Sequence, residues 1–135
     1  MHADPSRLLR LTFTVNAVST AATGLAFLAG GRWLGPLFGL APAVLAVLGA
    51  AFVAFGLHLS AVLRQPEISR GQALYFALLD STYVAASVLL LLGWPQLLSG
   101  IGRLVFALLA DVVAVFAIAE FVGYRRLSGL VSRTA

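Results

Sequence analysis

The sequence contains no cysteine and no lysine, and charged residues of any kind are scarce. Without cysteine there are no disulfides, no thiol redox chemistry and no thiolate-ligated iron–sulfur clusters. Without lysine there is no amine for a retinal Schiff base or a pyridoxal cofactor. Only 10% of the residues are charged and 61% are hydrophobic, a composition typical of a membrane protein and not of a soluble domain of this size.

Four apolar stretches of membrane-spanning length divide the 135-residue chain. They predict helices over about 8–30, 42–63, 71–93 and 104–124, forming a single domain: an all-α integral membrane protein, an antiparallel four-helix transmembrane bundle. Glycines and prolines predict a turn over 31–42, and 125–135 is predicted to be a basic tail, poorly ordered at its end. A cleaved signal peptide is the competing interpretation of the first stretch, although Asn16 and several hydroxyls interrupt it.

The basic residues, all of them arginines, predict the membrane topology. Four spans place both termini and the connector 64–71 on one side, which holds seven arginines against Arg32 and Arg103 on the other. The positive-inside rule therefore puts both termini in the cytoplasm, and the net charge of +4 needs no nucleic-acid partner to explain it. In helix count and length the chain resembles small four-helix proteins of the bacterial inner membrane, including the DoxX-like class. That resemblance implies an inner-membrane location and carries no residue roles.

Polar residues near the middle of the spans are the main functional candidates. A charge there costs about 2.5–3.5 kcal/mol on insertion scales, so it usually has a partner or a purpose. A rise of about 1.5 Å per residue puts three helices' polar groups within about two turns of one another near the midplane. We therefore predict an intramembrane polar layer of Asn16, Asp80, Tyr83 and Asp111. Two close aspartates would share a proton and form a proton or cation relay; alternatively, each is neutral and holds helices in register.

A second polar layer is predicted about 9 Å nearer the cytoplasm, containing His58, Glu120 and Arg10. Glu120 can pair with Arg10 or Arg125 there, and His58 can be a structural contact to Glu120, a proton shuttle, or a haem or metal ligand. Asp111 and Glu120 are nine residues apart, about half a turn out of phase. One of them is therefore expected to face the bundle core and the other an oligomer partner or the headgroup region.

The sequence has no phosphate-binding loop, no nucleophile elbow and no zinc motif, so a non-catalytic role is favoured. The first function expected is a subunit or interaction protein of a membrane complex. The second is a small oligomeric transporter or channel for protons, cations or a small polar solute, using Asn16, Asp80 and Asp111. The third is a lipid, quinone or haem binder. Expected partners are the lipid bilayer and either further copies of the chain or other membrane subunits; no particular cofactor is indicated.

Overall fold

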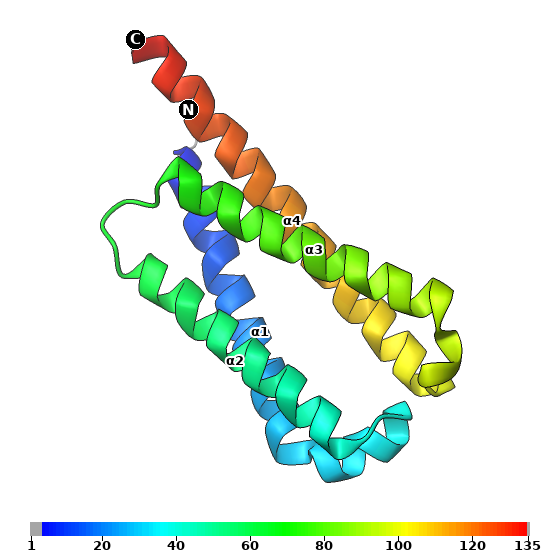
Figure 1. The fold of residues 1–135 in the computed structure, drawn as a ribbon. Helices are drawn as coiled ribbons and strands as arrows, with labels where there is room; N and C mark the ends of the chain where they lie inside the picture. Colours follow the sequence, from blue (N-terminus) through cyan, green and yellow to red (C-terminus); the bar gives the residue numbers. More distant parts are fainter. Residues whose placement is uncertain (1–3, 135) are drawn as a thin grey trace.

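The computed structural model describes residues 4–134, which form a bundle of four long α-helices (Figure 1). The helices are α1 (Pro5–Phe38), α2 (Pro42–Leu63), α3 (Arg70–Gly93) and α4 (Gly100–Thr134), with a short 3₁₀ helix, η1 (Pro95–Leu97), between α3 and α4. Figure 1 shows the two termini at the same end of the bundle. The prediction of an all-α fold with four long apolar helices is confirmed.

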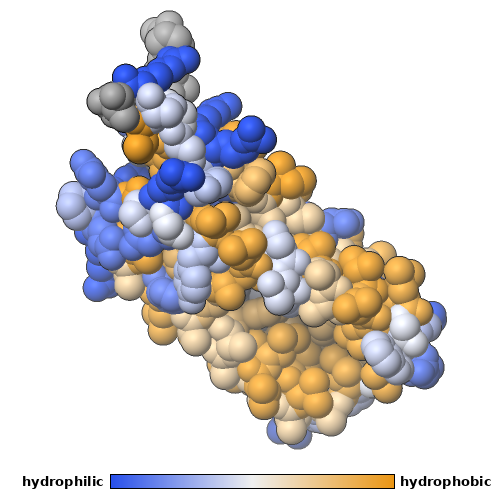
Figure 2. Space-filling model, turned by 45° about the horizontal axis from the view of Figure 1, so that its top comes forward, coloured by the Kyte–Doolittle hydropathy of each residue, from blue (hydrophilic) through white to orange (hydrophobic). Residues whose placement is uncertain are grey.

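Each of the four helices is long and apolar enough to cross a membrane, which indicates a multi-pass membrane protein. Large apolar side chains point outward along all four helices, as expected for surfaces that face lipid. Figure 2 shows polar residues gathered at the end that carries the termini and apolar residues over much of the rest of that face. The bundle is therefore apolar both inside and outside, and its buried polar groups are exceptions that need a reason.

Helix α1 is longer than the sequence pattern predicts. The expected turn over 31–42 is helical as far as Phe38, and only Gly39–Ala41 connect α1 to α2. Gly39 ends the helix because its φ of 79° lies in the left-handed region, which glycine adopts at little cost. Gly35, which looks like a turn residue in the sequence, instead allows a close approach: a Cβ there would lie 2.8 Å from the Leu40 carbonyl oxygen.

Helix α4 is also longer than predicted, because it continues through most of the expected basic tail to Thr134. Arg125 and Arg126 do not end the helix, since charged side chains are good helix formers once the chain has left the apolar region. Arg133 lies in the last turn, where a positive charge complements the helix dipole. The final tail residue, 135, lies outside the described part of the chain.

Three helix pairs hold the bundle together: α1 with α2, α3 with α4, and α1 with α4. Glycines bring α1 and α2 into close contact, because a Cβ on Gly24 would lie 2.6 Å from the Gly49 carbonyl oxygen. The backbones of α2 and α3 hardly approach each other. Aromatic side chains bridge part of that space, with Phe55 against Phe76 and Phe52 against Tyr83.

The apolar core has two parts. One lies at the end with the termini and is centred on Leu9, Phe13, Leu59 and Phe76; the other lies at the opposite end and is centred on Phe27, Phe38, Leu45 and Phe106. Between them α1, α3 and α4 carry buried polar side chains, and this middle level holds the candidate site.

The close contact of α1 with α2 predicts that Gly24→Ala destabilises the protein. The added methyl must displace the backbone of α2, which costs about 1–3 kcal/mol and outweighs the better helix propensity of alanine. Thermal unfolding in mild detergent, followed by circular dichroism, measures the change. Gly129→Ala is the matched control, because nothing lies within 4 Å of a Cβ at that helical glycine. Equal stability of the two variants would contradict the proposed packing.

Candidate functional site

Two carboxyl groups and one amide form a buried cluster in the middle of the bundle. The Asn16 Nδ2 donates to Asp80 Oδ2 at 2.8 Å and to Glu120 Oε1 at 3.1 Å. Asn16 and Glu120 are 0% exposed and Asp80 is 4% exposed. An amide NH₂ has two hydrogens, so it can satisfy one oxygen of each carboxyl. The cluster therefore joins α1, α3 and α4 through a single side chain.

Local structure fixes the direction of the Asn16 amide. Thr20 lies one turn further along α1, and its hydroxyl donates to Asn16 Oδ1 at 2.8 Å. That bond occupies the amide oxygen and leaves the NH₂ facing the two carboxyls. The flipped amide would put an oxygen against two acidic oxygens, so this orientation is the one that the network supports. Thr12, Asn16 and Thr20 share one face of α1, as the sequence spacing predicts.

The two carboxyls cannot both be charged at acceptable cost in this environment. Asp80 and Glu120 accept hydrogen bonds from the same amide NH₂, so the two buried carboxyls are close neighbours. Neither arginine nor histidine bonds to either carboxyl among residues 4–134; the groups facing them are Asn16 from α1 and Tyr83 from α3. Glu120 Oε2 is buried without a hydrogen-bond partner in this part of the chain. The chemically reasonable states are one proton shared by the pair, which leaves one negative charge, or two protons, which leave none.

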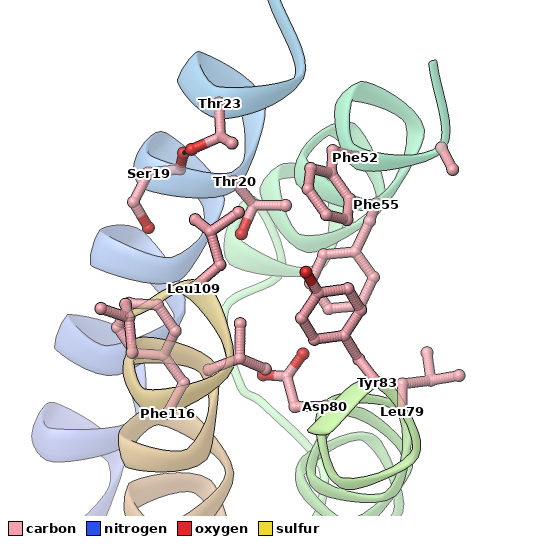
Figure 3. Close-up of a pocket in the computed structure, with 13 residues that line it drawn as sticks. Ser19, Thr20, Thr23, Phe52, Phe55, Leu79, Asp80, Tyr83, Leu109 and Phe116 are labelled. Carbon is pink, nitrogen blue, oxygen red and sulfur yellow. Dashed lines mark hydrogen bonds between the residues drawn. The ribbon is translucent and has the colours of Figure 1, made fainter. Parts of the chain in front are cut away.

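A cavity of about 230 Å³ lies directly over the Asp80 carboxyl. Figure 3 shows Asp80 and Tyr83 of α3 pointing into it, with Thr20 of α1 on one side and aromatic rings of α2 on the other. Its polar lining residues are Ser19, Thr20, Thr23, Asp80 and Tyr83, and its apolar ones include Phe52, Phe55, Leu109 and Phe116. All four helices contribute, so the cavity is a property of the assembled bundle.

The Tyr83 hydroxyl lies between this cavity and a second, larger space. It is buried and completes no hydrogen bond within the described residues, although Ser87 lies nearby on the same helix. Tyr83 and Ala51 line both spaces. A buried hydroxyl without a partner is costly, and it is therefore a ready donor or acceptor for a molecule that occupies either space.

Asp111 does not lie in the predicted polar layer, because its side chain is exposed on the outer face of α4. The sequence pattern identifies two acids on opposite faces of this helix, but it does not say which face packs inward. The inward face is that of Phe116, Ala117 and Glu120, which is buried. Within residues 4–134 Asp111 has no hydrogen bond or ion pair.

The second predicted layer does not form either. Glu120 reaches Asn16 because its axial offset is about one turn, which a glutamate side chain can span. Arg10 instead donates to the backbone carbonyls of Leu63, Gln65 and Pro66, and so satisfies the end of α2. His58 is exposed, and its ring packs on Tyr75 and Phe76. These three residues therefore lie in three different environments.

Sequence reasoning did not assign the cavity walls to the site. Thr20 was detectable, since it follows Asn16 by four residues and shares its face. Phe52 and Phe55 carry no comparable signal, because a phenylalanine in an apolar helix faces lipid as easily as a cavity. Within the described range no group of three or more His, Asp and Glu side chains is placed to hold a metal ion.

The cluster predicts that Asn16→Leu destabilises the protein. Both carboxyls would lose their shared donor while remaining buried, which costs about 1–3 kcal/mol. Asp80→Asn should cost less than about 1 kcal/mol, because an amide oxygen can accept the same bond as a neutral carboxyl. Thr14→Val is the control on the same helix, since Thr14 is exposed and bonds only to its own helix. Unfolding midpoints in detergent rank the stabilities of the three variants. An Asn16→Leu protein as stable as Thr14→Val would rule out the structural role of the amide.

Comparison with known protein families, curated proteins and solved structures finds no match to this chain. No residue role can therefore be transferred from a relative. Three features of the chain itself bear on its function: the buried Asn16–Asp80–Glu120 cluster, the cavity over Asp80, and the exposed carboxyl of Asp111.

Proposed function

We propose that the protein is a small membrane transporter for protons and a small cationic or polar solute, with Asp80 and Glu120 as the binding pair. The observation that supports it is a cavity lined by the Asp80 carboxyl, with Glu120 linked to Asp80 behind it through the Asn16 amide. Purely structural polar contacts between membrane helices need no empty space beside them. Here Asp80 faces a cavity large enough for a small molecule, since an apolar cavity of about 150 Å³ already holds benzene.

A pair of buried carboxyls beside a cavity is suited to the exchange of a proton for a cation. When the cavity is empty, the pair holds a proton. When a cation enters, the proton can leave, so the total charge buried in the bundle stays the same. The free-energy cost of adding a further charge to the membrane interior is thereby avoided. Tyr83 and Thr20 supply hydroxyls beside the carboxyl, and these can bond to the solute or to water that accompanies it.

The proposed topology is an antiparallel bundle in a bacterial-type inner membrane with both termini in the cytoplasm. Seven arginines on the side of the termini against two on the other support it. The cavity would then lie within the hydrocarbon layer, reached from one side or from the bilayer itself.

A second candidate, a subunit or interaction protein, is favoured by Asp111. It lies in an exposed apolar stripe with spacings of three and four residues: Ile101, Leu104, Leu108, Val115 and Ile118. Other exposed side chains with hydroxyls in the spans, such as Thr14 and Thr82, bond to their own helix. The Asp111 carboxyl makes no such bond within residues 4–134, and we expect it to bond across an interface, as a single polar residue does in a helix seam. Transport and assembly are compatible, because small transporters often work as oligomers.

The transport proposal predicts that Asp80→Asn and Glu120→Gln each reduce proton flux in liposomes by about a hundredfold, as expected for loss of an essential proton-transfer group. A pH-sensitive dye inside the vesicles reports flux after a pH jump. Glu67→Gln is the control, because Glu67 lies in the exposed connector and should leave flux unchanged. Unchanged flux in both cluster variants, at normal folding and insertion, would show that the carboxyl pair is structural.

The assembly proposal predicts crosslinking through α4. The chain has no native cysteine, so Leu108→Cys or Val115→Cys introduces a single thiol on the Asp111 face. Oxidation in native membranes should give a product of twice the monomer mass if a second copy binds there, because disulfides form only between closely spaced Cβ atoms. Leu89→Cys on α3, 65% exposed, is the control and should stay monomeric. A product with another mass would identify a different subunit, and no product at either position would exclude assembly through this face.

A further inference from the structure

The second space in the bundle is an apolar cleft between α2 and α3. Its volume is about 940 Å³. It lies toward the end of the bundle opposite the termini, since its lining includes Gly39 and Leu40 after α1 and Leu97 and Leu98 before α4. Along its walls are Val44, Val47 and Leu48 from α2, and Ala86, Ser87 and Leu90 from α3. The cleft exists because the backbones of these two helices stand apart.

The cleft and the polar cavity adjoin each other. Ala51 and Tyr83 line both of them, and Ala51 contributes only a methyl group at the shared border. Toward the termini aromatic rings pack together between α2 and α3, with Phe55 on Phe76 at 5.7 Å between ring centres and His58 on Phe76 at 5.1 Å.

We propose that these two adjoining spaces open into each other and bind an amphipathic amine taken from the bilayer, with its alkyl chain in the α2–α3 cleft and its cationic head beside Asp80. This inference rests on the proposed function, because it names the class of solute that the carboxyl pair takes. Four aspects of the geometry support it, and they concern the tail, the head, the aromatic walls and the route.

The tail fits because the cleft is long, apolar and bordered by side chains that lipid would otherwise cover. The part of the site beside the Asp80 carboxyl is polar, and a cation is the group that a carboxylate binds best. Aromatic faces stabilise alkylammonium groups. Four aromatic side chains line the cavity together with Asp80: Phe52, Phe55, Tyr83 and Phe116. An anion or a neutral sugar would find no matching charge or dense set of donors here.

The route fits because a charged head is costly in the hydrocarbon layer, whereas an amine can cross the bilayer interface with its tail anchored in lipid. Sideways access between α2 and α3 lets the tail stay in an apolar environment throughout. When the head reaches Asp80, the proton shared by Asp80 and Glu120 is released, so one positive charge replaces another. No arginine or histidine contacts the pair within the described residues, so its binding capacity is not already taken by a basic partner.

Photolabelling in lipid nanodiscs tests this inference. The probe is an alkyltrimethylammonium with a diazirine in the middle of its chain, used below its micelle concentration. The expected adducts map by peptide mass spectrometry to cleft residues such as Val47, Ala86 and Leu90. Excess decyltrimethylammonium should remove them, whereas decanol, which has the same chain and no charge, should compete at least about tenfold less well. Asp80→Asn should abolish the preference for the charged competitor.

A variant at the junction separates this site from general lipid contact. Ala51→Phe should weaken decyltrimethylammonium binding about tenfold or more by blocking the tail's path to the carboxyl. Ala54→Phe is the control, since Ala54 is exposed on the same helix and lines neither space. Adducts spread evenly over outward residues such as Leu25, Leu89 and Leu92, or equal competition by decanol, would overturn the proposal.

The outcome also distinguishes this inference from the proposed function. If Asp80-dependent proton flux is present but the charged and neutral competitors are equal, transport stands and the amine is the wrong solute. If Asp80→Asn changes neither flux nor labelling, both proposals fail. Labelling confined to the cleft together with proton release on binding, measured in weakly buffered solution, supports both.

Discussion

The relative placement of α1, α3 and α4 depends on one side-chain amide, that of Asn16. Asn16 is the only side chain that bonds to both buried carboxyls in residues 4–134, and through it α1 is tied to α3 and α4 at mid-height. The apolar cores on either side of this level pack without directional bonds, and in a membrane they gain little from leaving lipid. A directional polar contact at the centre is therefore what selects one register and one rotation of these helices over others of similar apolar packing.

Helix α2 takes no part in that cluster, and this explains where the bundle is open. It is held to α1 by glycine contacts such as Gly24 with Gly49, and to α3 by aromatic side chains at the end with the termini. At the other end nothing polar draws α2 toward α3, so the cleft remains between them. The position of the opening thus follows from which helices carry polar residues.

The sequence predicts much of this fold and only part of the site. Apolar runs of spanning length have no other stable arrangement than helices, so the four helices are found easily. The ends of the helices are harder to predict. Gly31 and Gly35 look like turn residues, but α1 continues past them because small residues also permit helix contact. Asn16 and Asp80, predicted to lie at one depth, are joined by a hydrogen bond. Which acid of α4 joins them depends on helix rotation, and in lipid both faces of a helix are apolar, so hydrophobic periodicity carries no information about it.

The exposed position of Asp111 on α4 has a consequence for function. In a soluble bundle an acid such as Asp111 on the outer face would be an ordinary solvated residue. In a bilayer the outer face is the least polar environment of all, so the same position becomes as demanding as a buried one. The chain therefore carries two polar features that must be satisfied in different ways, the internal Asn16–Asp80–Glu120 cluster and the external carboxyl of Asp111. Under the two proposals, the cavity takes a solute and Asp111 bonds to a neighbouring chain. Because α4 carries both Glu120 and Asp111, a solute that shifted α4 would then also change the contact with that neighbour.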